Sequence, residues 1–469
     1  MSVNSPPLGG TRSGAFELRT ATLENARTRT RAPVSRLGLV GLAGMLATGL
    51  LVSISAVSTD KLLPQTTQTG LGPIGLAGSF GSTGIKLGSA GLTITLALMV
   101  ISYVVTVGAA RRLSPVLVLG CIAALNALIL LGPPLASTDI FSYQFYGRIG
   151  QMYGFNPYLA GPHAIAGDPL YYYIGAKWIG TPTVYGPLFT GLSYLLAPLS
   201  IPASVFAYKA IAAVSSLAIV ALVWDGARLR GVDPTRAAAL VGLNPLIVVY
   251  GVGGGHNDLL MLVPMVAGIV LLLQRRGRLG AGASVLGAAV KVTAGLTLPF
   301  ALADARGRMA SPSRRDILIG AGVTAALLAA FAFVLFGTGP LHLPATIEAV
   351  QGRGNWQSIP GFIGARLGFS SVGQPVALIL GAVFATTTTW LVWRVWRGEL
   401  DWIAAAGWAA VALLVTAASL LPWYIAWLMP LAALGRDHRL WQTSIALTVI
   451  IAIFQLLAYI PHGSSLPGL

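Results

Sequence analysis

The chain has 469 residues, of which 55% are hydrophobic and only 9% charged. A soluble fold of this size needs roughly a quarter of its residues charged, so the composition excludes an ordinary soluble protein and predicts a polytopic membrane protein. The net charge of +16 comes from basic residues in short groups between apolar runs, which argues against nucleic acid as a partner.

The N-terminal residues 1–36 carry six arginines and no apolar run, and are predicted to form a disordered basic tail. The first apolar run, 37–59, can span a bilayer and begins too far along the chain for a cleavable signal peptide. We expect an all-α membrane protein with about 11–13 transmembrane helices in one domain, 37–469. Further charge-free runs occupy 87–110, 113–138, 210–224, 237–255, 259–274, 317–341, 367–393 and 440–461.

Three apolar segments do not fit simple crossings. Residues 185–201 open with a Tyr-Gly-Pro turn and are predicted not to cross fully. Residues 279–303 are interrupted by Lys291 and are predicted to form a re-entrant pair of half-helices. The run 402–435 is predicted to fold back at Pro422-Trp423. Such breaks are tolerated at membrane depth where they line a cavity.

The arginines predict how the chain crosses the membrane. A cytoplasmic N-terminus places 22 of the 25 arginines on the cytoplasmic side, as the positive-inside rule requires. Only Arg148, Arg353 and Arg366 are then left outside. We therefore expect a multi-pass protein of the plasma membrane.

The long outer loop of about 136–184 is the most informative segment. Eight of the 14 tyrosines lie between Asp139 and Tyr185; their rings suit sugar faces, although a membrane-interface belt explains about half of them. Asp139 stands beside a membrane helix, where an ionised carboxylate is costly without a partner or a task. It is a candidate general base, with capping of a helix that starts at Ile140 as the alternative.

A second polar group, His256-Asn257-Asp258, follows three glycines at the outer surface. The glycines allow a backbone to approach a ligand closely, and a turn with an Asx cap would need no histidine, so we favour a binding role. Lys291 would attract a phosphate, with pairing to Asp258 as the alternative. Lys209, at the edge of its apolar run, is expected to snorkel.

Other polar and aromatic residues complete a candidate lining for an outer cavity. They are Arg353, Trp356, Trp423 and Tyr424, and an aromatic belt explains Trp423 almost as well. The remaining histidines show no metal-ligand spacing and the one cysteine, Cys121, lies in an apolar run, so no metal site is predicted.

The chain carries an ordered set of motifs: Asp139, Asn156-Pro157-Tyr158, Trp178, Tyr185-Gly186-Pro187-Leu188, His256-Asn257-Asp258 and Lys291. This set resembles the polyprenol-phosphate-mannose-dependent α-1,6-mannosyltransferases, GT-C-type membrane glycosyltransferases of actinobacterial cell envelopes. The resemblance covers most of 130–430. It implies a GT-C-type bundle that transfers mannose with inversion from polyprenyl-phosphate mannose to a mannan or lipomannan-type acceptor on the outer face, without a cofactor. The family extends the α-1,6-mannan backbone of lipomannan and lipoarabinomannan precursors.

The resemblance also implies roles for single residues. Asp139 would take the proton of the acceptor's 6-hydroxyl, and Lys291 with Arg353 would engage the departing polyprenyl phosphate. Two spans precede the helix that leads to Asp139, whereas simpler GT-C enzymes have one. The remaining candidates would bind donor or acceptor: Tyr143, Tyr158, Trp178, Tyr185, His256, Asn257, Asp258, Trp356, Trp423 and Tyr424.

Two alternatives remain at this stage. One is another GT-C enzyme, such as an α-1,2-mannosyltransferase or an arabinofuranosyltransferase, because one aspartate activates either hydroxyl. The other is a lipid or sugar transporter, but such proteins favour midplane sites and internal repeats, and the two halves show no repeat. The sequence leaves the oligomeric state open.

Overall fold

The computed structural model describes residues 35–55, 84–85, 87–305, 312–351, 358–367 and 374–459. Within these ranges the regular structure is helical, apart from one isolated bridge between Ser55 and Ile85. The predicted all-α membrane fold is confirmed. Nearly all of the predicted tail, and both Arg353 and Trp356, lie outside the described residues.

Six helices of the described chain are long and apolar enough to cross a membrane. A seventh span is available if α8 (Pro234–Gly242) and the π-helix η6 (Leu246–Val252), bent by 50°, are counted together. The six are α2 (Arg36–Ser53), α3 (Gly88–Ala109), α7 (Ile201–Arg230), α12 (Arg314–Phe336), α15 (Gln374–Arg397) and α18 (His438–Tyr459).

The sequence predicted about 11–13 transmembrane helices, whereas six or seven in the described chain are long enough to cross. Shorter apolar helices make up the difference between the two numbers. At 1.5 Å per residue, α4 (Pro115–Leu131) and α9 (Asn257–Leu273) reach only about 25 Å. With 10 residues, α6 (Pro187–Leu196) reaches about 15 Å. The prediction that 185–201 does not cross fully is therefore confirmed.

The other two predicted breaks are also present. The helix α10 (Gly277–Val290) ends at Lys291, whose backbone is extended, and the chain continues as η7 (Val292–Leu296) and α11 (Thr297–Asp304). After α16 (Trp402–Thr416) the chain leaves the helix and restarts at Pro422 as η9 (Pro422–Trp427), followed by α17 (Met429–Leu434). The interruptions thus coincide with a lysine and a proline.

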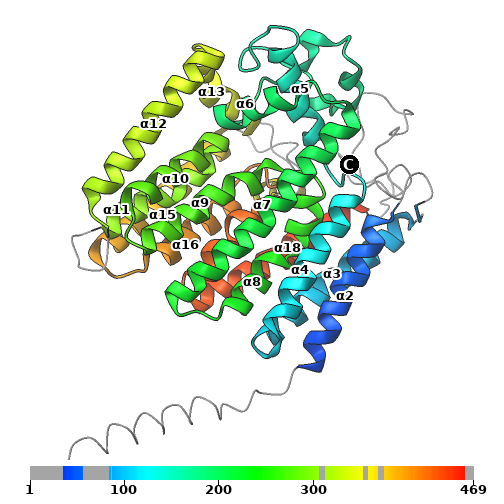
Figure 1. The fold of residues 1–469 in the computed structure, drawn as a ribbon, viewed down its shortest axis with the longest axis vertical. Coiled ribbons are helices and arrows are strands. Elements are labelled where there is room, and N and C mark those ends of the chain that lie inside the picture. Colours follow the sequence, from blue (N-terminus) through cyan, green and yellow to red (C-terminus); the bar gives the residue numbers. More distant parts are fainter. Residues whose placement is uncertain are drawn as a thin grey trace, which may run out of the picture.

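Several of the remaining elements form one end of the bundle. There, α5 (Asp139–Gln151), α6, α13 (Leu343–Gln351) and the end of α12 lie together in Figure 1. The loop after α5 holds three short 3-10 helices, η3 (Pro162–Ile165), η4 (Pro169–Tyr173) and η5 (Ala176–Trp178). The 3-10 helix η8 (Gly339–His342) joins α12 to α13 at this end, and other short segments are η2 (Ala110–Arg112) and α14 (Ile359–Arg366).

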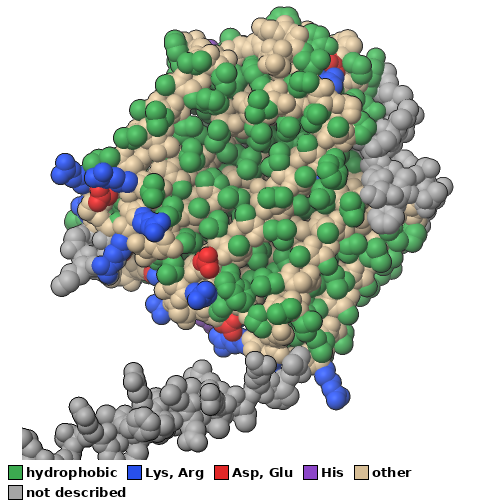
Figure 2. All heavy atoms as spheres, in the orientation of Figure 1, with side chains coloured by type: hydrophobic (Ala, Val, Ile, Leu, Met, Phe, Trp, Pro, Cys, Tyr) green, Lys and Arg blue, Asp and Glu red, His purple; other side chains and the backbone are tan. Residues whose placement is uncertain are grey.

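Arginine-rich segments gather at the opposite end. The Ser35 N–H donates to the Arg112 carbonyl at 3.2 Å, and Arg230 pairs with Asp401 at 2.8 Å. Figure 2 shows lysine and arginine side chains along the lower and left edges, while the surface between the two ends is mostly apolar. This grouping is the one expected from the positive-inside rule.

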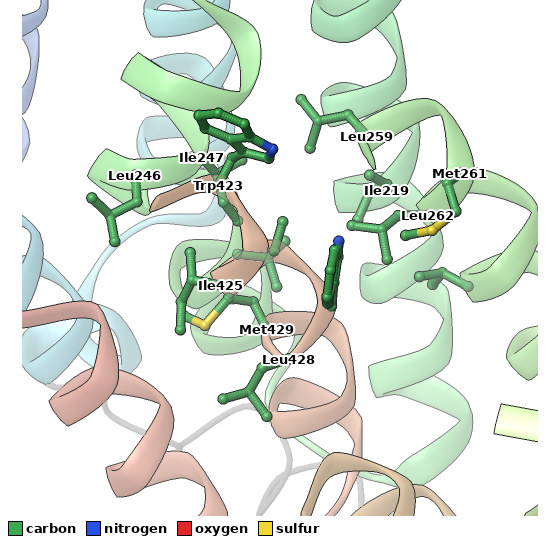
Figure 3. Close-up of a cluster of buried hydrophobic side chains, with 14 of the residues drawn as sticks. Ile219, Leu246, Ile247, Leu259, Met261, Leu262, Trp423, Ile425, Leu428 and Met429 are labelled. Atoms are coloured by element: carbon green, nitrogen blue, oxygen red, sulfur yellow. The ribbon is translucent and has the colours of Figure 1, made fainter. Parts of the chain in front are cut away.

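The segment η9–α17 is surrounded by other helices of the bundle. Figure 3 shows Trp423, Ile425, Leu428 and Met429 packed among side chains of η6, α7 and α9. Trp423, Ile425 and Met429 are each at most 4% exposed. A short interrupted helix is therefore held by core packing on all sides, which fixes the aromatic residues of η9 in place.

Candidate functional site

The connection from α4 to α5 is held against the glycine turn that follows η6. The Leu135 N–H donates to the Gly253 carbonyl at 3.0 Å. The Lys209 ammonium of α7 donates to the carbonyls of Gly132 and Pro133 at 2.5 and 2.8 Å. These contacts bring Asp139 beside the glycine turn that precedes His256.

Lys209 was expected to snorkel, and that expectation is wrong. The residue is 1% exposed, and its ammonium binds the carbonyls at the C-terminal end of α4 instead of reaching the bilayer surface. A cation there matches the negative end of the α4 dipole. The sequence around Lys209 did not indicate this contact, because α4 and Lys209 are distant in the sequence.

Asp139 is the first residue of α5, and 22% of its side chain is exposed. Its Oδ2 lies 3.6 Å from His256 Nδ1. Thr138, the residue before α5, makes no cap hydrogen bond with its side chain, whereas the Ser137 hydroxyl accepts the Asp139 N–H at 3.1 Å. Ser137 therefore satisfies the first backbone N–H of α5. Burial raises the pKa of Asp139 to about 6, and the positive charge of Lys291 opposes that rise. At neutral pH the group is ionised and still basic, as a general base requires.

His256 lies between η6 and α9 and is 1% exposed. Its Nδ1 is 3.2 Å from the Tyr143 hydroxyl, and its ring stacks on Trp423 at 3.4 Å between centroids. Burial, helped by the charge of Lys291, holds the pKa of His256 well below its ordinary value. The ring is therefore neutral, and its approach to Asp139 is a polar contact without an ion pair.

Asp258 and Lys291 form an ion pair beside this histidine. Lys291 Nζ is 2.7 Å from Asp258 Oδ1, and the same oxygen accepts the indole N–H of Trp427 at 2.7 Å. The ammonium also lies 4.7 Å from the ring centroid of Tyr424 and 5.3 Å from that of Trp427. The pairing that the sequence left as an alternative for Lys291 is present. Its side chain stays 16% exposed.

The Tyr185-Gly186-Pro187 turn is built against the break in α10. The Gly186 N–H donates to the Val290 carbonyl at 3.0 Å, and a Cβ on Gly186 would collide with the carbonyl of Ala289. Only glycine permits this approach. The turn therefore positions the residue that follows Val290, which is Lys291.

Aromatic rings pack around Tyr143, one helical turn after Asp139 in α5. Tyr143 packs edge-on against Tyr185 at 5.0 Å, Phe189 at 4.9 Å and Tyr208 at 5.5 Å between centroids. Such edge-to-face pairs stabilise a rigid arrangement. Tyr158 is one layer further away, because its hydroxyl donates to the Tyr185 carbonyl at 3.0 Å.

The Asn156-Pro157-Tyr158 turn braces the outer loop. Asn156 Oδ1 accepts the Tyr158 N–H at 3.0 Å, and its Nδ2 donates to the Phe336 carbonyl at 2.7 Å. A second contact that holds the loop is the ion pair between Arg148 Nη1 and Asp168 Oδ1 at 2.8 Å. The Tyr153 hydroxyl donates a hydrogen bond to the same Asp168 carboxylate.

Four buried polar atoms of the cluster have no hydrogen-bond partner among the described residues. They belong to three consecutive residues: Nε2 of His256, Oδ1 and Nδ2 of Asn257, and Oδ2 of Asp258. Buried polar groups are nearly always hydrogen-bonded. These atoms include donors and acceptors, so hydroxyl groups, which can both donate and accept, suit them.

The structure brings together most of the residues selected from the sequence. Trp178 lies in η5, where a Cβ on Gly175 would be 3.2 Å from the Trp178 ring and 3.0 Å from the Thr138 hydroxyl oxygen. Two neighbours of the cluster were missed: Trp427, whose only signal was a third aromatic residue close to Trp423, and Lys177, a rare basic residue in an outer loop. The residues in the cluster are Asp139, Tyr143, Tyr185, His256, Asp258, Lys291, Trp423 and Tyr424, with Asn257 between His256 and Asp258 in the chain.

Fold and site together define a polytopic helical membrane protein whose polar cluster surrounds an aspartate at one end of the bundle, away from most of the arginines. Residues 35–305 match the family described as α-(1→6)-mannopyranosyltransferase, N-terminal domain, and residues 359–468 match the MptB C-terminal domain. The first match covers more than half of the chain. The chain belongs to the α-(1→6)-mannopyranosyltransferase family, and the predicted family is confirmed.

Curated proteins with these names are similar over most of the chain. α-(1→6)-Mannopyranosyltransferase A of Mycobacterium tuberculosis is 28% identical over 364 residues, which is 72% of this chain and 68% of that protein. α-(1→6)-Mannopyranosyltransferase B of Corynebacterium glutamicum is 27% identical over 382 residues, which is 73% of this chain and 62% of that protein. No solved structure matches the chain.

Proposed function

We propose that the protein transfers mannose with inversion from polyprenyl-phosphate mannose to a mannan or lipomannan-type acceptor, forming α-1,6 linkages. The names of its relatives support mannosyl transfer and the linkage. The observation that carries the mechanism is the position of Asp139, which is partly exposed next to the ion pair of Lys291 and Asp258. A base and a cation in one cluster are what transfer from a lipid phosphate needs.

The reaction would proceed in one displacement. Asp139 takes the proton of the acceptor's 6-hydroxyl while that oxygen forms a bond with the anomeric carbon of mannose. The bond between this carbon and the phosphate oxygen breaks, and its electron pair leaves with the polyprenyl phosphate. Attack opposite the leaving group converts a β-linked donor into an α-linked product. No cofactor enters this scheme.

Lys291 would stabilise the departing phosphate. An ammonium has three N–H donors, and one of them is directed at Asp258, so others are available where the side chain is exposed. Negative charge that develops on the phosphate as the bond breaks is stabilised by a cation already in place. Arg353 is proposed for the same role and lies outside the described residues.

The unpaired atoms of His256, Asn257 and Asp258 would bind sugar hydroxyls. Tyr424 is half-buried beside Lys291 and stacks on Trp427 at 4.1 Å between centroids, so its exposed part would border the bound sugar. We therefore expect Asn257→Ala to raise the KM for the sugar substrate it contacts, because a hydroxyl would lose its partner. Trp423 would support this region indirectly, since it stacks on His256.

The outer face of the plasma membrane is proposed from the arginines. Most of them gather at the end of the bundle away from α5, with Arg148 of α5 as an exception, and that end is expected to face the cytoplasm. The cluster would then meet donor and acceptor on the opposite side. A transporter would place its polar groups near the midplane, and this cluster lies where α5 begins.

The test is mannosyl transfer in membranes that contain the protein, with polyprenyl-phosphate mannose and a short α-1,6-mannoside acceptor. Wild type, Asp139→Asn and the control Asp225→Asn, an exposed carboxylate near the far end of α7, are compared at equal expression. We expect α-1,6-linked product from wild type and the control, and a loss of at least about 1,000-fold in Asp139→Asn. Equal transfer by Asp139→Asn would move the base elsewhere. Absence of transfer by wild type would favour the transporter.

A further inference from the structure

The backbone just before His256 packs against the start of α5. Gly255 has a positive φ of 63°, and a Cβ there would stand 2.6 Å from Ile140 Cδ1. Only glycine combines that conformation with so close an approach. The His256 N–H donates to the Gly251 carbonyl at 2.9 Å. Since Ile140 follows Asp139 in α5, this turn brings the imidazole to the carboxylate in a defined position.

Stacking fixes the plane of the imidazole ring. The rings of His256 and Trp423 are 3.4 Å apart between centroids and inclined by only 16°, and the His256 side chain is 0% exposed. Rotation of the ring would break this packed contact. The Nδ1 edge therefore stays directed at two oxygens, Tyr143 Oη at 3.2 Å and Asp139 Oδ2 at 3.6 Å.

The neutral ring carries one proton, and its surroundings decide which nitrogen holds it. An ionised carboxylate can only accept hydrogen bonds, so a lone pair on Nδ1 would face the negative charge of Asp139. Nε2 is buried and has no hydrogen-bond partner among the described residues. A buried N–H at that nitrogen would lack an acceptor, which is costly. Both arguments place the proton on Nδ1 and leave Nε2 as an acceptor.

We infer that His256 is the positioning residue of the base, and that its Nδ1–H holds Asp139 Oδ2 so that the carboxylate is directed at the acceptor hydroxyl. The inference rests on the proposed function, and it adds a role for Nδ1 to the sugar contact proposed for Nε2. The contact of 3.6 Å would shorten to a hydrogen bond in the complex with both substrates, as catalytic hydrogen bonds often do. Asp139 remains the group that takes the proton, and His256 keeps its own.

This contact also affects how readily Asp139 is protonated. Burial raises the pKa of Asp139 to about 6, and a donor to the ionised carboxylate opposes such a rise. Loss of the Nδ1–H should therefore raise the pKa further. An exchange at position 256 leaves the other titratable groups that face Asp139 in place. They are Tyr143, Lys177, Tyr185, Asp258, Lys291 and Tyr424.

Two amide side chains separate this role from packing. The amide of Asn occupies the place of Nδ1, and that of Gln the place of Nε2, while both lack the ring that stacks on Trp423. Transfer by wild type, His256→Asn and His256→Gln is measured from about pH 5 to 8 in membranes at equal expression. We expect kcat of His256→Asn to stay within about threefold, with a raised KM, and kcat of His256→Gln to fall at least about tenfold. The acidic limb of the profile should move up by about one pH unit in His256→Gln only.

A second measurement does not depend on transfer. Nitrogen-15 NMR of the full-length chain with labelled histidines, in lipid nanodiscs, distinguishes a neutral ring protonated at Nδ1 from one protonated at Nε2. Wild type is compared with Asp139→Asn and with the control Asp225→Asn, an exposed carboxylate near the far end of α7. We expect one histidine with its proton on Nδ1, whose signals shift in Asp139→Asn and stay unchanged in the control.

Two results would overturn the inference. One is an equal loss of kcat in His256→Asn and His256→Gln when both variants fold, because packing would then explain both losses. The other is a histidine spectrum that Asp139→Asn leaves unchanged, and this result decides alone if neither variant folds. If the spectrum shows the Nδ1 proton but wild type forms no mannoside, the proposed reaction fails and the contact stands. If transfer occurs and the two amides lose kcat equally, the inference fails alone.

Discussion

Lys291 Nζ and Asp258 Oδ1 lie 2.7 Å apart, and they join the break in α10 to the start of α9. The same carboxylate oxygen accepts the indole N–H of Trp427 from η9. One acid thus connects three segments that are distant in the sequence. Because Asp258 is 1% exposed, its charge depends on these partners.

Removal of either partner of this pair should destabilise the protein. Asp258→Asn and Lys291→Met each leave one buried charge without its partner, and we expect each to lower the free energy of unfolding by about 3 kcal/mol. The double variant should lose clearly less than the sum. Denaturant titration in detergent micelles measures all four free energies. Additive losses would show that the two groups do not interact.

The pH dependence of transfer should follow Asp139. Its pKa is raised by burial to about 6, and only the carboxylate can accept the proton of the acceptor hydroxyl. Below this pH, kcat/KM should fall about tenfold per pH unit, and it should be flat between about pH 7 and 8. A profile still flat at pH 5 would exclude Asp139 as the base. Glu at this position should keep a shifted profile, whereas Asn should remove it.

The raised pKa of Asp139 also affects the stability of the fold. Because the folded-state pKa of Asp139 lies above its ordinary value of 3.8, the ionised carboxylate weakens folding, and stability from the protonated form is lost as pH rises from about 4 to 6. Asp139→Asn should therefore raise the thermal midpoint at pH 7.5 while it abolishes transfer.

Asp168→Asn provides the matched contrast to that variant. Asp168 is buried and paired with Arg148 at 2.8 Å, so its replacement should lower the midpoint. Equal shifts in the two variants, measured by thermal unfolding with the same detergent, would argue against this difference between the carboxylates.

Gly186→Ala should reduce activity by displacing a lysine that it does not touch. The added methyl group would collide with the Ala289 carbonyl and weaken the hydrogen bond from Gly186 to Val290. Since Lys291 follows Val290, we expect kcat to fall at least about tenfold. Gly180→Ala is the control, because a Cβ there meets no atom within 4 Å. Equal activity of the two variants would contradict the prediction.

Lys209→Met should destabilise the connection between α4 and α5. The variant leaves the carbonyls of Gly132 and Pro133 without the ammonium that they accept from, and buried acceptors without a donor cost about 1–3 kcal/mol each. Hydrogen exchange of the backbone amides between α4 and Asp139 should increase. Unchanged exchange there would show that Lys209 does not hold this segment.

Much of the architecture follows from local patterns. Charge-free runs of about 20 residues predict spanning helices, and the breaks at Lys291 and Pro422 were visible because a charge or a proline interrupts an apolar run. Asp139 and the His256-Asn257-Asp258 group were also visible, since polar residues beside membrane helices are costly without a task. The sequence by itself thus determined the class of fold, the interrupted segments and the main candidate residues.

Which of these residues meet was decided by the tertiary structure alone. The pairing of Asp258 with Lys291 and Trp427, the burial of Lys209 at the end of α4, and the approach of η5 to Asp139 join segments separated by long stretches of chain. Periodicity and composition report what each segment tends to form, but a contact between distant segments depends on how whole helices pack. For this reason the sequence could show which groups are costly to bury, and only the fold shows which partner compensates each of them.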